Sequence, residues 1–349
     1  MSAEAAVLVS RPSRRFRAAR QAGTSLAAVL LALVFGALLV AVAGGDALAA
    51  YGALVEGGIG SPYAIGQVAL VTTPLLIIGL GLSIAFRAGV WNIGAEGQLF
   101  MGALAGGALA VLLPLDARFA LILLVVIAAM AAGAAWGGIV GVLRARWGVN
   151  EVISSLLLNY VAIYAFTYVI RRPLRDPSAS SLQGRTVPDE ARLPVVDEFF
   201  VHIGIFVALA LVPLVAYVLN RAPFGFRLRV MGMNPDAAEA AGVARRRMII
   251  TVMLVSGALA GLAGAFQIIG LAGRLDPNVS QSYGFMAIVV ALLGRLSAVG
   301  VLLAAVFIAF LTVGGQAMSV SEGLPYAIIL AIQGVFVIFL LIADRLARG

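Results

Sequence analysis

Long apolar runs separated by short polar segments are the dominant pattern of this chain. Ten runs can be distinguished, at residues 25–43, 64–86, 92–113, 118–143, 151–170, 200–220, 248–272, 284–299, 300–319 and 325–343. A transmembrane helix needs about 20 mostly apolar residues, and most of the runs approach that length. The alternating ten-residue segments of a membrane β-barrel are missing from the pattern. The sequence therefore predicts an all-α, polytopic transmembrane helical bundle with about ten spans.

Two parts of the pattern leave alternatives open. Arg295 interrupts the stretch 284–319, which fits either two short spans or one span with a re-entrant piece. Near the N-terminus, basic residues, the apolar run 25–43 and Ala47-Leu48-Ala49 together resemble a secretory signal peptide. The many apolar runs that follow favour an uncleaved first span instead.

The arginines predict the orientation of the chain. With ten spans and a cytoplasmic N-terminus, 17 of the 24 basic residues fall on the cytoplasmic side. The positive-inside rule therefore places both termini in the cytoplasm. Residues 1–23 are expected to form a mobile basic cytoplasmic tail, and residues 24–349 the transmembrane domain. Within that domain, residues 171–199 are expected to form a periplasmic cap or hairpin, and residues 221–247 a cytoplasmic loop.

Composition excludes several classes of function. The chain is 62% apolar and 11% charged. A soluble domain has about 45–50% apolar residues and about 25% charged residues. It has no lysine for a P-loop or Schiff base, and no cysteine for a thiol nucleophile or an iron–sulfur cluster. Its single histidine, His202, cannot build a multi-histidine metal site. We therefore expect no catalytic residue, metal site or cofactor.

The net charge of +8 raises the question of a nucleic-acid partner. In a membrane protein, excess arginine more often marks cytoplasmic loops that face anionic lipid headgroups. We therefore expect membrane lipid, and no nucleic acid, as a partner.

The first polar segment lies between two apolar runs and contains Asn92, Glu96 and Gln98 among glycines. A charged side chain at the centre of a span costs about 2.5–3.5 kcal/mol on insertion scales. Such a cluster is typical of a helix break that faces a cavity rather than lipid. The alternative is a helix start at the interface, with Asn92 as cap and Glu96 in the first turn.

The second polar segment follows Asn150. Glu151, Ser155 and Asn159 are spaced four residues apart and share one helix face, with Ser154 and Tyr164 beside them. Hydrogen bonding between helices is the simpler interpretation of this stripe. A substrate pathway is the alternative.

The third segment, from Gly232 to Val243, predicts a short cytoplasmic helix. Asn234 suits its N-cap, Pro235 its first turn and Gly242 its end. A helix of this length is not stable alone in water, so it is either an ordinary surface turn or a docking element held by a partner.

Together these segments resemble the permease subunits of bacterial ABC importers, in the class of simple-sugar, branched-chain amino acid and nucleoside systems. The nucleoside type is the most similar, from about residue 62 to the C-terminus. The resemblance rests on Trp91-Asn92-Ile93-Gly94-Ala95-Glu96-Gly97-Gln98, on Val149 to Tyr160 and on Tyr283 to Arg295. Ser155 stands where threonine is commoner, and Met286 where an acidic residue is common, which weakens any role for residue 286.

The resemblance implies a function and its partners. The chain would be a permease subunit in the bacterial cytoplasmic (inner) membrane, moving nucleosides inward by alternating access. ATP would be bound by a separate ABC ATPase subunit. The other implied partners are a second permease subunit, often a different chain, and a periplasmic or lipoprotein substrate-binding protein.

The polar segments and the resemblance together give the candidate residues. The substrate-pathway candidates are Asn92, Glu96, Gln98, Glu151, Ser155 and Asn159. The candidates for the helix that couples to the ATPase are Gly232, Asn234, Pro235, Asp236, Ala237, Ala238, Glu239 and Gly242.

Two other functions remain open at this stage. A simple-sugar importer of the ribose or galactose type has the same architecture and differs only in its solute. An ion-coupled secondary transporter would work alone and would take up solute without ATP. An intramembrane enzyme is disfavoured, because no acid–base pair, metal site or nucleophile can be assembled from the polar segments.

Overall fold

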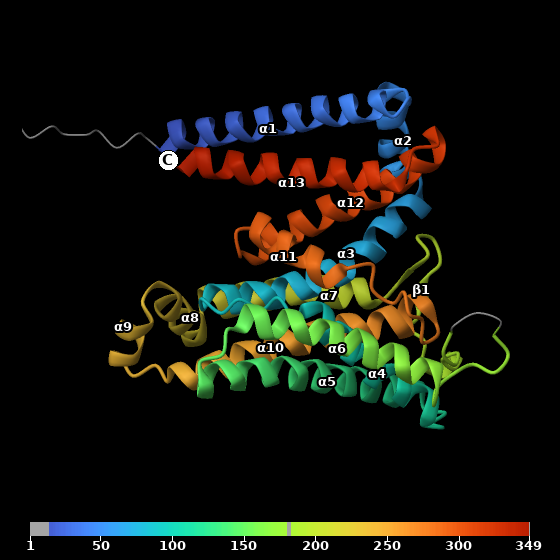
Figure 1. The fold of residues 1–349 in the computed structure, drawn as a ribbon, viewed down its shortest axis with the longest axis vertical. Helices are drawn as coiled ribbons and strands as arrows, with labels where there is room; N and C mark the ends of the chain where they lie inside the picture. Colours follow the sequence, from blue (N-terminus) through green and yellow to red (C-terminus); the bar gives the residue numbers. More distant parts are fainter. Residues whose placement is uncertain (1–13, 180–182, 349) are drawn as a thin grey trace, which may run out of the picture. The chain divides into compact units, whose positions relative to one another are not determined.

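Helices account for most of the computed structural model, which describes residues 14–179 and 183–348. The α-helices are α1 (Arg14–Val42), α2 (Ala47–Ile59), α3 (Pro62–Arg87), α4 (Ala95–Leu112), α5 (Arg118–Trp147), α6 (Glu151–Arg171), α7 (Gly204–Asn220), α8 (Pro223–Met233), α9 (Pro235–Ala240), α10 (Arg245–Phe266), α11 (Tyr283–Leu293), α12 (Ala298–Glu322) and α13 (Tyr326–Arg348). A 3₁₀ turn (Asp189–Ala191), a π-helical turn (Gln267–Ala272) and two short strands, β1 (Val195–Val196) and β2 (Val201–His202), complete the described elements. The expected helical bundle is confirmed (Figure 1).

The chain divides into two compact units. The core unit is Val55–Gly315, and the terminal unit comprises the chain up to Leu54 and from Gln316 onward. In the terminal unit, α1 packs along α13, and the Tyr51 hydroxyl donates a 2.6 Å hydrogen bond to the Leu33 carbonyl. Since α1 begins at Arg14, residues 14–23 of the expected tail are helical, and residues 1–13 lie outside the described part of the chain.

Local sequence signals define the helix ends of the core unit. The Ser61 hydroxyl accepts a 3.1 Å hydrogen bond from the Ala64 amide, and Pro62 occupies the first turn of α3. Asn150 caps α6 by accepting from the Val152 amide at 2.9 Å. Gly148, with φ of 66°, ends α5 in the left-handed conformation that favours glycine.

Glycines let the central helices of the core unit pack with their backbones in contact. α10 packs against α5, α4 and α3. A Cβ atom added at Gly102 would overlap the backbone of Gly261, and one added at Gly133 would overlap the carbonyl oxygen of Gly257. These glycines therefore serve close helix packing, as small residues commonly do in membranes.

When helices are counted by their length and apolar composition, the structure has fewer candidate membrane spans than the ten that the sequence pattern predicted. Seven helices of the described chain are long and apolar enough to cross a membrane, or nine if two bent helix pairs are each one span. The bends are 115° between 27–42 and α2, and 65° between α7 and α8. If both bent pairs are counted as spans, the one predicted span still missing is 284–299, where α11 has 11 residues and is about 16 Å long.

The segment around α11 nevertheless connects the two ends of the core unit. At one end, the Gly184 amide donates a 2.8 Å hydrogen bond to the Leu275 carbonyl, so residue 275 lies with the loop after α6. At the other end, the Arg87 Nε donates to the Leu296 carbonyl at 2.8 Å. Residues 275–296 thus pass from one end to the other although only part of the segment is helical.

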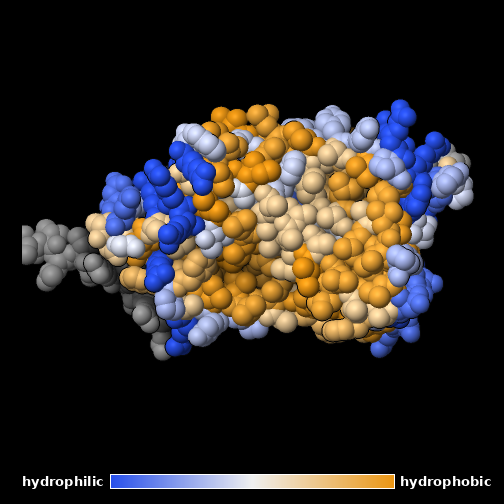
Figure 2. All heavy atoms as spheres, turned by 90° about the horizontal axis from the view of Figure 1, so that it is seen from below, coloured by the Kyte–Doolittle hydropathy of each residue, from blue (hydrophilic) through white to orange (hydrophobic). Residues whose placement is uncertain are grey.

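The two long loops lie at opposite ends of the core unit. Figure 1 shows α8 and α9 at one end and β1 at the other. β1 and β2 form an antiparallel hairpin, so the expected hairpin in residues 171–199 extends to His202. On the face seen in Figure 2, a broad hydrophobic surface separates hydrophilic side chains that gather at its two ends. Such a distribution is typical of a membrane-spanning protein.

His202 is the one histidine of the chain, and it is buried at the end of the core unit that holds the hairpin. Its Nδ1 accepts a 3.1 Å hydrogen bond from the Gly204 amide, and its ring packs edge-on against Phe266. Because burial disfavours the charged imidazolium, the pKa of His202 is lowered to about 4.

Candidate functional site

The polar side chains of the segment between α3 and α4 are buried, whereas Trp91 beside them is 44% exposed. The chain leaves the helical path after Arg87, and α4 begins at Ala95. Asn92, Glu96 and Gln98 are 0%, 3% and 1% exposed. Buried polar groups cost free energy unless they are hydrogen-bonded, so the partners of these side chains decide what the segment can do.

Asn92 is the centre of a buried hydrogen-bond network. Its Nδ2 donates to Gln98 Oε1 and to Ser256 Oγ, each at 2.9 Å. Its Oδ1 accepts from Gln98 Nε2 and from the Gly94 amide, each at 3.0 Å. Four hydrogen bonds therefore satisfy the Asn92 amide and tie the segment to α4 and α10.

Ser256 is a member of this site that the sequence analysis missed. It is 1% exposed and lies on α10, 164 positions from Asn92 along the chain. The only signal for it was a polar side chain within the apolar run 248–272. That signal does not identify a partner, because periodicity gives the face of a helix and not its neighbour.

The polar stripe of α6 holds the backbone of the same segment. Ser155 Oγ accepts from the Ile93 amide at 3.2 Å, so serine at this position still supplies the hydroxyl. Asn159 Oδ1 accepts from the Gly97 amide at 2.8 Å, and Asn159 Nδ2 donates to the Ile93 carbonyl at 2.9 Å. The predicted shared face is therefore confirmed, and in this conformation it serves hydrogen bonding between helices.

The two buried acids have different partners. Glu96 Oε2 accepts a 2.7 Å hydrogen bond from the Gly284 amide, at the start of α11. Glu151 Oε2 lies 3.3 Å from Arg144 Nε at the end of α5. The Glu96 hydrogen bond thus joins the motif Tyr283 to Arg295 to the buried polar segments before α4 and on α6. Glu151 instead forms an ion pair at the start of α6. Met286 lies half-buried on α11.

A short helix, α9 (Pro235–Ala240), forms within the predicted segment Gly232 to Val243, whereas Gly232 itself belongs to the end of α8. Asn234 Oδ1 accepts from the Asp236 and Ala237 amides at 3.1 and 3.0 Å and so caps α9. Gly242 follows the helix with φ of 82°. Of the eight candidate residues, Ala238 is buried at 1% exposure and Pro235 is half-buried, and the rest lie on the surface. The Ala238 side chain therefore packs into the protein, while the surface residues of the segment are available to a partner.

The end of α8 lies directly against the end of α3. A Cβ atom added at Gly232 would overlap the carbonyl oxygen of Arg87. The Arg87 side chain in turn donates to the Leu296 carbonyl at the break between α11 and α12. Arg295 and Leu296 have φ of 52° and 53°, a conformation uncommon for residues with a Cβ atom. Three helix ends therefore meet at Arg87, which immediately precedes the buried segment.

These features define a class of protein. Long apolar helices surround a polar helix break in the core unit, and Gly232 at the end of α8 contacts Arg87, which directly precedes that break. This arrangement is the one expected of a transport component of a membrane.

Comparison with known proteins identifies the family. Residues 64–343 match the family described as branched-chain amino acid transport system / permease component. The chain therefore belongs to this family of ABC transporter permease components, which are not enzymes. Such a permease works with an ATPase and a substrate-binding component. No solved structure matches the chain.

Three relatives match over most of both chains. The glucose ABC transporter permease protein TsgB13 of Haloferax volcanii is 38% identical over 93% of this chain and 88% of its own length. The guanosine ABC transporter permease protein NupP of Bacillus subtilis is 35% identical, covering 90% and 91%. The nucleoside ABC transporter permease protein NupB of Lactococcus lactis is 31% identical, covering 89% of each. The same organisms each hold a second permease relative, 28%, 26% and 24% identical to this chain.

Proposed function

We propose that this chain is the permease subunit of an ATP-driven importer of nucleosides in the bacterial cytoplasmic membrane. The observation that carries the proposal is its similarity to two permeases named for guanosine and for nucleosides, at 35% and 31% identity over about nine-tenths of the chain. The three segments of the nucleoside-type signature also converge on one buried site, through Asn92, Asn159 and the Gly284 amide.

In the proposed topology both termini are cytoplasmic and the chain crosses the membrane ten times. The passage of residues 275–296 between the two ends of the core unit supplies the crossing that α11 alone is too short to make. The arginine distribution supports a cytoplasmic position for α8 and α9 and a periplasmic position for residues 171–199.

The proposed coupling runs from α9 through the end of α8 to Arg87. A partner that holds and moves α9 would push Gly232 against the Arg87 carbonyl, because the two backbones are already in contact. Arg87 precedes the segment that Asn92, Ser155 and Asn159 hold in place. Movement at the ATPase would thus reach the polar interior through α9, the end of α8 and its backbone contact with Arg87.

The six predicted pathway residues keep their proposed role in this scheme. In the described conformation their polar atoms bond to the chain itself, so a solute would meet them after residues 90–94 move. The amides of Asn92, Gln98 and Asn159 are the groups that then offer both donors and acceptors to a ribose or a base edge. If variants at Asn92 and Asn159 that fold normally imported the same solutes with the same preference, this role would be wrong.

The second permease subunit is proposed to be a different chain. Three organisms each hold one permease that resembles this chain at 31% identity or more and another at 28% or less. A pair of unequal permeases in each organism is what a heterodimeric membrane core requires. The substrate-binding partner is proposed to be a periplasmic protein or lipoprotein that docks on the outer loop.

A sugar importer is the second candidate, and the 38% identity to a glucose permease favours it. The two candidates separate in one experiment. Cells lacking this chain and cells carrying it on a plasmid are supplied with radiolabelled guanosine, uridine, glucose or ribose. The proposal expects loss and rescue of nucleoside accumulation with sugar uptake unchanged. Loss of sugar accumulation alone would establish the second candidate instead.

A further inference from the structure

The outward face of α6 carries three tyrosines in a row. Tyr160, Tyr164 and Tyr168 are spaced four residues apart and are 55%, 70% and 65% exposed. They lie opposite the stripe of Ser155 and Asn159 that bonds to the chain's own interior. One helix therefore has one polar face that is occupied and a second, aromatic face that is open.

None of the three hydroxyls or rings has a partner within the described part of the chain. Their side chains carry no hydrogen bond, ring contact or ion pair there. Within the core unit, α6 packs against α4 and α5, and Trp136 of α5 donates to the Leu158 carbonyl at 3.3 Å. The tyrosine face points away from these contacts, so no helix packed against α6 covers it.

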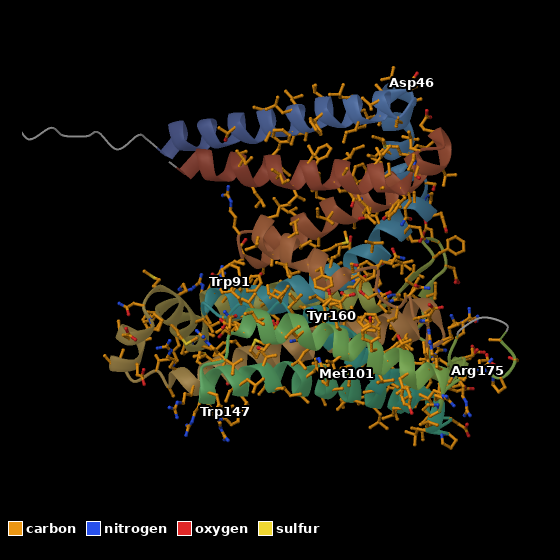
Figure 3. All side chains as sticks on the ribbon, in the orientation of Figure 1. Asp46, Trp91, Met101, Trp147, Tyr160 and Arg175 are labelled. Atoms are coloured by element: carbon orange, nitrogen blue, oxygen red, sulfur yellow. The ribbon has the colours of Figure 1, made fainter. Side chains whose placement is uncertain are left out.

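The position of Tyr160 along α6 differs from that of a tyrosine in the aromatic belt at the membrane surface. α6 has 21 residues and is about 31 Å long, close to the hydrocarbon thickness of a bilayer. Tyr168 is three residues from the end and fits the aromatic belt. Tyr160 begins about 14 Å along the helix, near its middle, and Figure 3 shows it between the ends marked by Trp147 and Arg175. A phenol at this depth is poorly placed against lipid, because hydrocarbon offers its hydroxyl no hydrogen-bond partner.

The chemistry of the row fits a planar, polar solute better than a second helix. Helices in membranes approach each other through small residues, and in this chain those residues are used between α4, α5 and α10. Tyrosine instead offers a ring face for stacking and a hydroxyl at its edge. A nucleoside has the complementary parts, a flat base and a set of ribose hydroxyls, and bases stack on aromatic side chains without needing a particular sequence.

We propose that Tyr160 and Tyr164, with Tyr168 at the outer end, form a ladder of stacking positions along which a nucleoside passes the membrane. This inference rests on the proposed function and adds the residues that contact the solute. The ladder lies on the face of α6 opposite Glu151, Ser155 and Asn159. The same helix therefore offers stacking positions on one face and, on the other, holds the backbone at Ile93 and Gly97.

The test uses the complete importer, reconstituted in vesicles with its ATPase, second permease and binding protein. The variants are Tyr160→Leu, Tyr164→Leu and Tyr160→Phe, and the control is Tyr217→Leu, an exposed tyrosine near the end of α7. We expect each leucine variant to raise the KM for guanosine import about tenfold, the value of one base–aromatic stacking contact. Tyr160→Phe keeps the ring and should change KM less, and Tyr217→Leu should import as the wild type does.

The outcomes distinguish this inference from the proposed function. If vesicles with the wild-type chain imported no nucleoside, both the proposed function and this inference would be wrong. Wild-type import together with unchanged KM and rate in both leucine variants would overturn the ladder alone. Loss of the second permease from purified leucine variants would also overturn it, because the face would then be a contact between permeases.

Discussion

Replacing Asn92 with alanine is the sharpest perturbation of the buried site. The change removes the four hydrogen bonds that Asn92 makes with Gln98, Ser256 and Gly94. It removes little apolar surface and leaves the helices themselves intact. The effect therefore reports how much the polar network contributes to holding residues 90–94 between α4, α6 and α10.

The magnitude follows from the donors that lose their acceptor. Without Asn92 Oδ1, the Gly94 amide and Gln98 Nε2 remain buried with one acceptor fewer. Each buried donor left without a partner costs about 1–3 kcal/mol. The expected loss is therefore about 4 kcal/mol in the free energy of unfolding, near the upper end of single-substitution effects.

Unfolding in mixed detergent micelles, followed by tryptophan fluorescence or circular dichroism, measures this loss. Asn278→Ala is the matched control, because Asn278 is an exposed turn residue outside the helices. The control should change stability by less than about 0.5 kcal/mol. A loss below about 1 kcal/mol for Asn92→Ala would refute the reasoning that this network anchors the segment.

Three further predictions concern other parts of the chain. Gly232→Ala should raise the ATP hydrolysed per solute imported, because its Cβ overlaps the Arg87 carbonyl, whereas Gly334→Ala, with open space around it, should not. Asn234→Ala should speed hydrogen exchange of the capped amides of α9 about fivefold, reflecting a cap worth about 1 kcal/mol, and unchanged exchange would contradict the cap. The His202 pKa of about 4 lies below the unfolded value of about 6.5, so its contribution to stability is complete above pH 6.5 and declines toward pH 4. Stability should be about 2 kcal/mol lower at pH 5 than at pH 7, and His202→Gln should remove that part of the decline.

The sequence predicted local features well where a residue's role depends on its neighbours in the chain. Asn234, Pro235 and Gly242 indicated the start and end of α9 because capping and left-handed termination act over a few residues. The four-residue spacing of Glu151, Ser155 and Asn159 indicated one helix face, and all three are buried together. These signals are local, so a single sequence contains them.

The remaining features depend on contacts between distant positions. Ser256 meets Asn92 only because α10 packs beside the helix break, and no pattern in either segment encodes that pairing. The pattern left the run 284–299 open as either a short span or a re-entrant piece. In the structure α11 ends at Leu293 because the chain turns at Arg295 and Leu296 against Arg87. Helix α2 was not anticipated, since hydropathy measures length and apolarity and does not register a 115° bend after α1.

The central claim is that this chain imports nucleosides only as part of an ATP-driven assembly. The most direct measurement is uptake of radiolabelled guanosine into vesicles that contain this chain, the ATPase, the second permease and the binding protein. ATP is supplied on the side of the membrane that the ATPase faces. We expect guanosine accumulation that requires ATP and each of the four components, with no accumulation of glucose. Guanosine uptake by this chain alone without ATP, or ATP-driven uptake of glucose in place of guanosine, would contradict it.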